Sequence, residues 1–100
     1  MAVNNKRLVK IMKALGNEHR LALYLEIAQQ QEAGFEDHAC VVSDIMKYVK
    51  LSAPTISHHL KELANAELIS TERHGKYLMA RIVKDTLEEL DRVLSLVRGA

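Results

Sequence analysis

The stretch from residue 52 to residue 63 constrains the fold most. It contains a signal for the start of a helix, and the helix that follows has one apolar face and one polar face. Ser52 can cap the helix with its hydroxyl, and Pro54 falls in the first turn, where its missing N–H costs least. One face of this helix is apolar at helical spacing and consists of Ile56, Leu60 and Leu63. The other face is polar and contains Thr55, Ser57, His58 and Lys61.

The polar face has the chemistry of a surface that reads nucleic acid. Small hydroxyls and imidazoles near the start of a helix allow close approach to DNA, and they can donate to or accept from base edges and phosphates. We interpret the helix as a recognition helix, in which Thr55, Ser57 and His58 contact bases and Lys61 contacts a phosphate. His59 lies next to the apolar face, so it can contact DNA or pack inward.

Length and composition predict a single domain over residues 1–100. One hundred residues, of which 48% are hydrophobic, support one modest core, and oligomerisation is a plausible source of added stability. The net charge of +1 does not by itself indicate nucleic-acid binding. The single Cys40 excludes an internal disulfide, and no apolar run reaches the ~18 residues of a membrane span or forms a signal peptide. We therefore expect a soluble cytoplasmic protein.

Two amphipathic helices are predicted ahead of this stretch. The first covers residues 4–15 and ends at Gly16. Its apolar stripe is Leu8, Ile11, Met12 and Leu15. Asn17 can cap the second helix, over residues 18–31, and residues 29–40 are expected to fray into a polar loop. The predicted buried face of the second helix is Leu21, Tyr24, Leu25 and Ala28, widened by Leu23 and Ile27.

A helix-turn-helix, a hairpin and a final helix are predicted after residue 41. The apolar spacing of Val42, Ile45, Met46 and Val49 indicates a short helix that ends before the recognition helix. Strand-like runs at 68–73 and 77–83 flank a turn in which Gly75 can adopt positive φ. The final helix, over residues 85–98, carries the stripe Leu87, Leu90, Leu94 and Val97. The fold class is mainly α with a β-hairpin wing, a winged helix-turn-helix of order α-α-α-α-β-β-α.

Three stretches of this sequence carry recognisable motifs, and they are residues 14–21, residues 51–63 with their Ser-His-His-Leu core, and residues 68–77 of the hairpin. Through these stretches the sequence resembles the ArsR/SmtB family of winged-helix repressors. The resemblance implies a homodimer on double-stranded operator DNA, with two recognition helices in successive major grooves of an imperfect inverted repeat. It also implies repression of the protein's own operon and release by a ligand. The implied dimer contacts are the stripes of the first and last helices, Leu8, Ile11, Met12, Leu15, Leu87, Leu90, Leu94 and Val97.

The resemblance also implies a set of DNA contacts beyond the recognition helix. Basic and imidazole side chains at the hairpin tip would reach the minor groove or its phosphates, and they are Arg73, His74 and Lys76. Lys50 stands in the turn where the family often has glycine, so it would be strained if its φ were positive, and it could reach a phosphate. Pro54 replaces a serine or threonine of the family pattern, which removes one hydroxyl contact.

The metal-sensing motifs of the family are altered in this sequence. The cysteine motif becomes Cys40-Val41-Val42-Ser43-Asp44, and the last helix contains no histidine. Because Zn²⁺ and similar ions need three or four thiolate or imidazole ligands, we predict no metal site and no cofactor, and the inducer is unknown. His38 and Cys40, with Glu36 or Asp37, could still form a metal or redox site, although a solvated loop is favoured.

The sequence also bears on an enzyme and on two alternatives to a repressor released by an unknown ligand. An enzyme is not expected, because Ser57 and His58 are adjacent on a helix and their side chains diverge by about 100°. A winged-helix module that binds protein and lacks DNA affinity is the first alternative. A redox- or metal-responsive repressor that uses Cys40 is the second.

Overall fold

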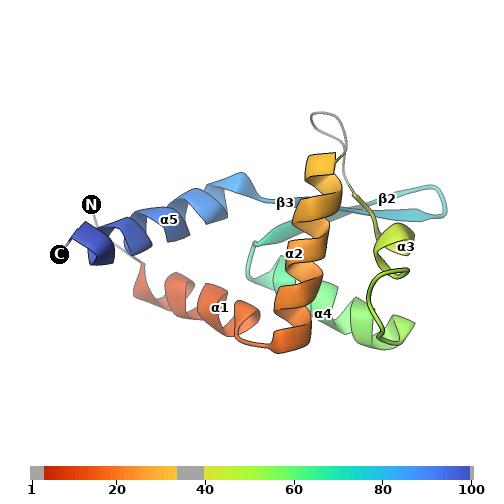
Figure 1. Cartoon of the computed structure of the whole chain (residues 1–100), viewed down its shortest axis with the longest axis horizontal. Coiled ribbons are helices and arrows are strands. Elements are labelled where there is room, and N and C mark those ends of the chain that lie inside the picture. The colour runs from red at the N-terminus through yellow and green to blue at the C-terminus, as the bar shows by residue number, and fades with distance from the viewer. Residues whose placement is uncertain (1–3, 34–39, 100) are drawn as a thin grey trace.

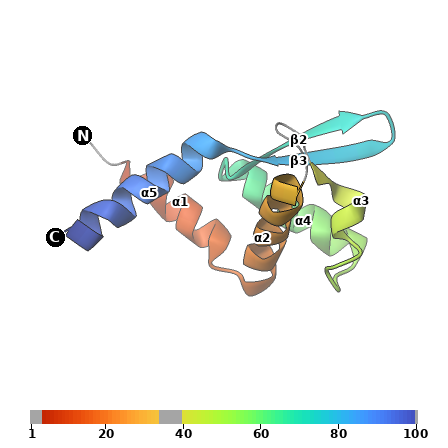
Figure 2. The ribbon, with the colours of Figure 1, turned by 45° about the horizontal axis from the view of Figure 1, so that its top comes forward.

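The computed structural model of the chain describes residues 4–33 and 40–99 (Figure 1). Within these two ranges, five helices and three strands follow one another as α1 (Asn5–Leu15), α2 (Glu18–Ala33), β1 (Cys40–Val41), α3 (Val42–Ile45), α4 (Ala53–Asn65), β2 (Ile69–His74), β3 (Tyr77–Ile82) and α5 (Lys84–Gly99). The predicted fold class is confirmed, and the short strand β1 is an addition to the predicted order. In both views α1 and α5 lie at one end of the molecule and the tip of the β2–β3 hairpin lies at the other (Figure 2).

Polar side chains start the helices where the sequence predicts. The Ser52 hydroxyl accepts from the backbone N–H of Thr55 at 3.4 Å, with Pro54 in the first turn of α4. The Asn17 side chain accepts from the N–H of Arg20 at 3.0 Å, and Gly16 follows the last residue of α1. These local hydrogen bonds satisfy backbone donors that a helix start leaves unpaired.

The core is centred on α2, which packs against α4 and the sheet. Its largest fully buried apolar side chains are Ile11, Leu23, Ile27, Ile45, Ile56, Leu63 and Leu68. The predicted buried face of α2 was partly wrong, because Leu21 and Leu25 are exposed. The helix turns Leu23 and Ile27 directly into the core, so the side chains about 200° away point outward.

The short strand β1 extends the hairpin into a sheet of order β1-β3-β2. Cys40 pairs with Ala80 and Val41 with Met79, in an antiparallel register. The predicted loop over residues 29–40 was therefore wrong at both ends, since α2 continues to Ala33 and residue 40 is in a strand. A tertiary contact holds the end of α2 against the sheet, because the Gln31 side chain accepts a hydrogen bond of 2.9 Å from the backbone N–H of Ile82 in β3.

Helix α3 is shorter than its apolar spacing predicts. It ends at Ile45 after four residues, and Met46 is exposed. The chain then tightens into a turn, with the N–H of Tyr48 bonded to the carbonyl of Ile45. Lys50 in the connection to α4 has no positive φ, so the strain considered for this position does not arise.

The end of α4 is fixed by a C-terminal cap with an unusual residue at its centre. Glu67 has φ +59°, in the left-handed region that glycine normally occupies there. The N–H of Leu68 bonds to the carbonyl of Leu63, and the N–H of Glu67 bonds to that of Ala64, as in a Schellman motif. Side chains of both outer helices hold this residue in place: Arg7 of α1 binds its carboxylate at 3.1 Å, and the fully buried Thr86 of α5 donates to its carbonyl.

Loss of the Thr86 hydroxyl should destabilise the fold. Thr86→Val keeps the volume of the side chain but leaves the Glu67 carbonyl without its donor, so we expect a loss of about 1–3 kcal/mol in the free energy of unfolding. Urea denaturation at fixed protein concentration measures this loss. The same substitution at the exposed Thr71 of β2 is the control and should change stability little. Equal stabilities of the two variants would contradict the assignment.

Candidate nucleic-acid interface

The outward face of α4 presents a compact set of hydrogen-bonding groups. Ser57, His58 and Lys61 are exposed, whereas Thr55 is half-buried. The Thr55 hydroxyl lies 2.8 Å from the Ser52 hydroxyl, so it takes part in the helix cap and has less freedom to contact a base. The N-terminal half of α4 therefore exposes a hydroxyl, an imidazole and, one turn later, an ammonium group.

His59 is a correction to the predicted set of DNA contacts. Its side chain is only 7% exposed and packs inward with the apolar face of α4. Its Nδ1 is buried and has no hydrogen-bond partner among the described residues. Burial lowers the pKa of His59 below its ordinary value, and the nearby positive charges of Arg20, His58 and His19 lower it further. His59 is therefore held neutral inside the protein.

The hairpin places three of the predicted residues at or near its tip. Gly75 has φ +61° in the turn, as predicted. Arg73, His74 and Lys76 are all exposed. The Lys76 ammonium lies 5.4 Å from the centre of the Tyr77 ring, and His74 Nε2 lies 3.3 Å from a carboxylate oxygen of Glu72. The tip is thus a cationic surface with one acidic neighbour.

A groove separates the recognition helix from the hairpin. It has a volume of about 220 Å³ and is lined by Ser57, Leu60, Lys61, Ala64, Thr71 and Leu78. Thr71 was missed by the sequence analysis. The sequence did contain a feature that could have predicted Thr71. Side chains alternate between the two faces of a strand, so Thr71 lies on the same face of β2 as Arg73. Hydroxyl and ammonium groups from α4 and β2 thus border one groove, which suits contacts to phosphates.

The opposite end of the molecule exposes apolar side chains on α1 and α5. Met12 and Val9 of α1 are about half exposed, as is Leu94 of α5, and Val97 is 71% exposed. By contrast, Ile11 is 1% exposed because it lies in the protomer's own core, which corrects its place among the predicted dimer contacts. The remaining predicted residues are half-buried or exposed, and they are Leu8, Leu15, Leu87 and Leu90. Val9 was missed because it lies off the stripe of α1.

The candidate Cys40 and His38 site falls largely outside the described residues. Residues 34–39 and the side chain of Cys40 are not described, so that site stays a prediction. Among the residues whose positions are described, no group of three or more histidine, cysteine, aspartate or glutamate side chains could hold a metal ion. Over the same residues, no helix is long and apolar enough to cross a membrane.

These elements define the class of the protein. A short helix, a turn, a recognition helix and a β-hairpin in this order form a winged helix-turn-helix, which is a DNA-binding fold. A likeness to solved structures agrees: a crystal structure of an ArsR family transcriptional regulator, RHA00566, superposes with a TM-score of 0.79 at 20% identity over 99% of this chain and 94% of that chain.

Comparison with known sequences gives the family. Residues 35–71 match the model of bacterial regulatory proteins of the arsR family. The arsenical resistance operon repressor of Staphylococcus xylosus is 32% identical over 92 residues, which cover 92% of this chain and 81% of that protein. The chain therefore belongs to the arsR family of bacterial regulatory proteins. This family and this fold are those of transcriptional repressors with a winged helix-turn-helix DNA-binding domain, not of enzymes.

One structural relative has a known assembly. The winged helix-turn-helix domain Mb0332 from Mycobacterium bovis, a possible ArsR-family transcriptional regulator, is homodimeric in solution. It shares 23% identity with this chain and has a TM-score of 0.68 over 94% of this chain and 80% of that chain.

The neutral buried His59 predicts a pH dependence of stability. The unfolded chain takes up a proton on this histidine near its ordinary pKa of about 6.5, whereas the folded chain does so only at lower pH. Stability is therefore fully present above that pH and is lost as the pH falls below it, by at most about 1.4 kcal/mol per pH unit.

Urea denaturation between about pH 7.5 and 5 measures this loss. His59→Gln should flatten the pH dependence, whereas His74→Gln, which changes an exposed histidine of the hairpin, should leave it in place. A wild-type profile that does not fall with pH would show that His59 titrates normally.

Proposed function

We propose that this protein is a homodimeric repressor that binds an inverted-repeat operator in double-stranded DNA and controls its own operon in the cytoplasm. The observation that carries the proposal is the separation of two surfaces. A hydrogen-bonding and cationic surface runs along α4 and the hairpin, and an exposed apolar surface covers α1 and α5 at the other end (Figure 1). Two copies joined at their apolar ends would present two recognition helices related by two-fold symmetry.

The recognition helix supplies the proposed sequence specificity. Ser57 and His58 would contact base edges in the major groove, with Thr55 at the edge of the contact because its hydroxyl also caps the helix. Lys61 would bind a phosphate along the groove between α4 and the hairpin, and Arg73 would bind the backbone next to it. His74 and Lys76 at the hairpin tip, and Lys50 before α4, would add further backbone contacts.

The dimer would be built on the exposed side chains of α1 and α5. Met12 and Val9 project from α1 on a different side from the buried Ile11, so α1 can pack on its own core and on a partner at the same time. Leu94 and Val97 extend the same kind of surface along the free half of α5. Packing such side chains against a second copy would remove an apolar area that a monomer exposes to water. The homodimeric state of the Mb0332 domain supports the proposal that this chain dimerises.

The relatives that control arsenical resistance do not by themselves give the inducer. This chain has one cysteine, so each protomer supplies at most one thiolate for a soft metal or metalloid ion. We propose that release from DNA does not depend on such an ion. Titration of the reduced protein on DNA from its own promoter, with Zn²⁺, with arsenite and after mild oxidation, tests this. Release that disappears in Cys40→Ser would establish the redox- or metal-responsive alternative instead.

The same titration separates a repressor from a protein-interaction module. A DNA-binding dimer that neutralises several phosphates loses affinity steeply as salt increases, because counterions are released on binding. Retention of a promoter fragment over unrelated DNA at about 0.15 M salt, with a strong salt dependence, supports the proposed function. Absence of any preference for promoter DNA would favour a module that binds another protein.

Two substitutions on α4 should weaken DNA binding in different ways. His58→Ala should cost about 1–3 kcal/mol of specific binding and relax the preference at one base pair. Lys61→Ala should weaken binding to all sequences and reduce the salt slope by about one phosphate per protomer. Fluorescence anisotropy with matched and altered operators measures both effects. Lys84→Ala, at the start of α5, is the control. Unchanged binding by both α4 variants would refute the assignment of the recognition helix.

Charged substitutions on the apolar surface should break the dimer. Met12→Glu and Leu94→Glu would each place a carboxylate in the proposed interface, so dimerisation should weaken at least about tenfold, and operator binding should fall with it. Analytical ultracentrifugation measures the association. Leu25→Glu on α2 is a matched control, because Leu25 is also exposed but lies on neither α1 nor α5. Equal behaviour of the three variants would place the interface elsewhere.

A further inference from the structure

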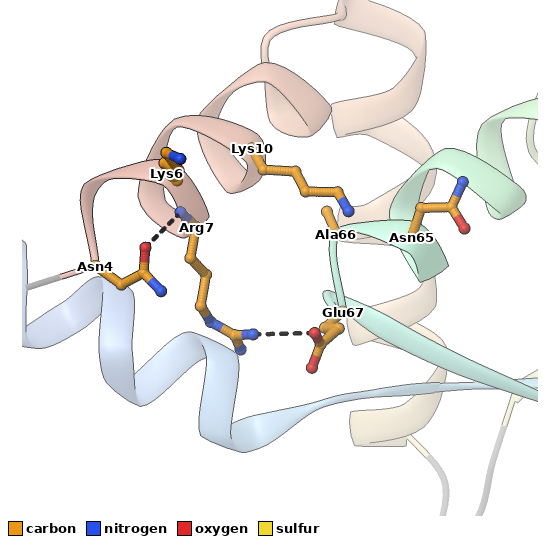
Figure 3. Close-up of a pocket in the computed structure, with 7 residues that line it drawn as sticks. All are labelled: Asn4, Lys6, Arg7, Lys10, Asn65, Ala66 and Glu67. Atoms are coloured by element: carbon orange, nitrogen blue, oxygen red, sulfur yellow. Dashed lines mark hydrogen bonds and ion pairs between the residues drawn. The ribbon is translucent and has the colours of Figure 1, made fainter.

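A cavity of about 350 Å³ lies between the first half of α1 and the end of α4 (Figure 3). It is lined by Asn4, Lys6, Arg7, Lys10, Asn65, Ala66 and Glu67. Its volume is in the range of sites for small molecules. One wall therefore comes from a helix of the proposed dimer surface and the other from the end of the recognition helix.

The free charge in this cavity is positive. Arg7 lies 3.1 Å from a carboxylate oxygen of Glu67 and 2.6 Å from one of Glu89, so these three groups together carry one negative charge, which Lys6 and Lys10 outweigh. The ammonium groups of Lys6 and Lys10 form no ion pair with any residue that the structure describes. The first turn of α1 also contains no acidic residue that would offset the positive end of the helix dipole. An anion would be attracted to this space.

Amide groups add donors on both walls. The Asn4 side chain accepts from the N–H of Arg7 with its oxygen, which leaves its NH₂ group available beside the cavity. Asn65 carries a second amide on the opposite wall, and the Lys10 side chain extends across towards that wall (Figure 3). A compact ligand with several acceptor oxygens could thus bind to both α1 and α4.

The cavity stays open in the proposed dimer. Lys10 and Met12 are two residues apart on α1, so their side chains point about 200° apart around the helix. The face that would pack on a partner is therefore nearly opposite to the face that lines the cavity. A ligand could bind without displacing the second protomer.

We propose that this cavity binds a compact, doubly charged anion, a phosphate monoester or a dicarboxylate, and that this ligand is the effector of the repressor. The role as effector rests on the proposed function, whereas the binding site does not. Because the ligand would contact α1 and the end of α4 together, it would change the position of the recognition helix relative to the dimer surface. DNA affinity would then depend on occupancy of the cavity.

Calorimetry on the full chain tests the site without DNA. The probes are glycerol 3-phosphate and succinate at constant ionic strength, with glycerol as the neutral control. We expect saturable binding of at least one probe, weakened about tenfold or more in the double variant Lys6→Gln and Lys10→Gln. Lys13→Gln, on the same helix but outside the cavity, should bind like the wild type. The probe that binds more tightly shows whether the site prefers a phosphate monoester or a dicarboxylate. Absence of saturation with both, or equal loss in both variants, would overturn the site.

Operator titrations with and without the bound probe test the effector role. The wild type should change its DNA affinity at least about threefold at saturation, and the double variant should not change. If the double variant instead binds DNA more weakly with no probe present and has a lower salt slope, the cavity holds a DNA phosphate and the proposal is wrong. If no variant binds DNA but calorimetry still shows the site, the proposed function fails and the anion site stands.

Discussion

The structure depends most on the cap at the end of the recognition helix. Glu67 adopts a backbone conformation that costs roughly 1–2 kcal/mol for a residue with a Cβ. Two backbone hydrogen bonds, the Arg7 guanidinium and the Thr86 hydroxyl hold it there. Arg7 comes from α1 and Thr86 from α5, so this single turn joins both outer helices to the helix that would read DNA. The cap therefore ties the C-terminal end of α4 to both outer helices.

The same turn brings the two proposed activities of the molecule into contact. Binding of DNA is assigned to the outward face of α4 and to the hairpin, whereas self-association is assigned to α1 and α5. These surfaces lie at opposite ends (Figure 1), yet Arg7 and Glu67 connect them through direct contacts. The cationic cavity lies beside this connection. A ligand there would act beside a contact through which a small shift would change the relation of the two surfaces.

The burial of side chains on α4 and α2 shows why the sequence alone only partly predicts which face of a helix is buried. His59 was left open by the sequence, since it borders both faces of its helix, and the packing of α4 on α2 decided the matter by enclosing it. On α2, apolar residues surround most of the helix, so periodicity alone could not separate the buried Leu23 and Ile27 from the exposed Leu21 and Leu25. For a helix that is apolar on nearly every side, the buried face cannot be predicted until the elements that pack against it are known.

The sequence by itself determined the order of the elements, the caps at Ser52 and Asn17, the turn at Gly75 and the polar face of α4. These features depend on side chains within a few residues of each other, and local chemistry is sufficient to predict them. Only the tertiary structure decided the strand β1, the early end of α3 and the conformation of Glu67. The strand β1 and the ion pair at Glu67 depend on residues far apart in the chain, Cys40 with Ala80 and Arg7 with Glu67, and no local pattern encodes such a pairing.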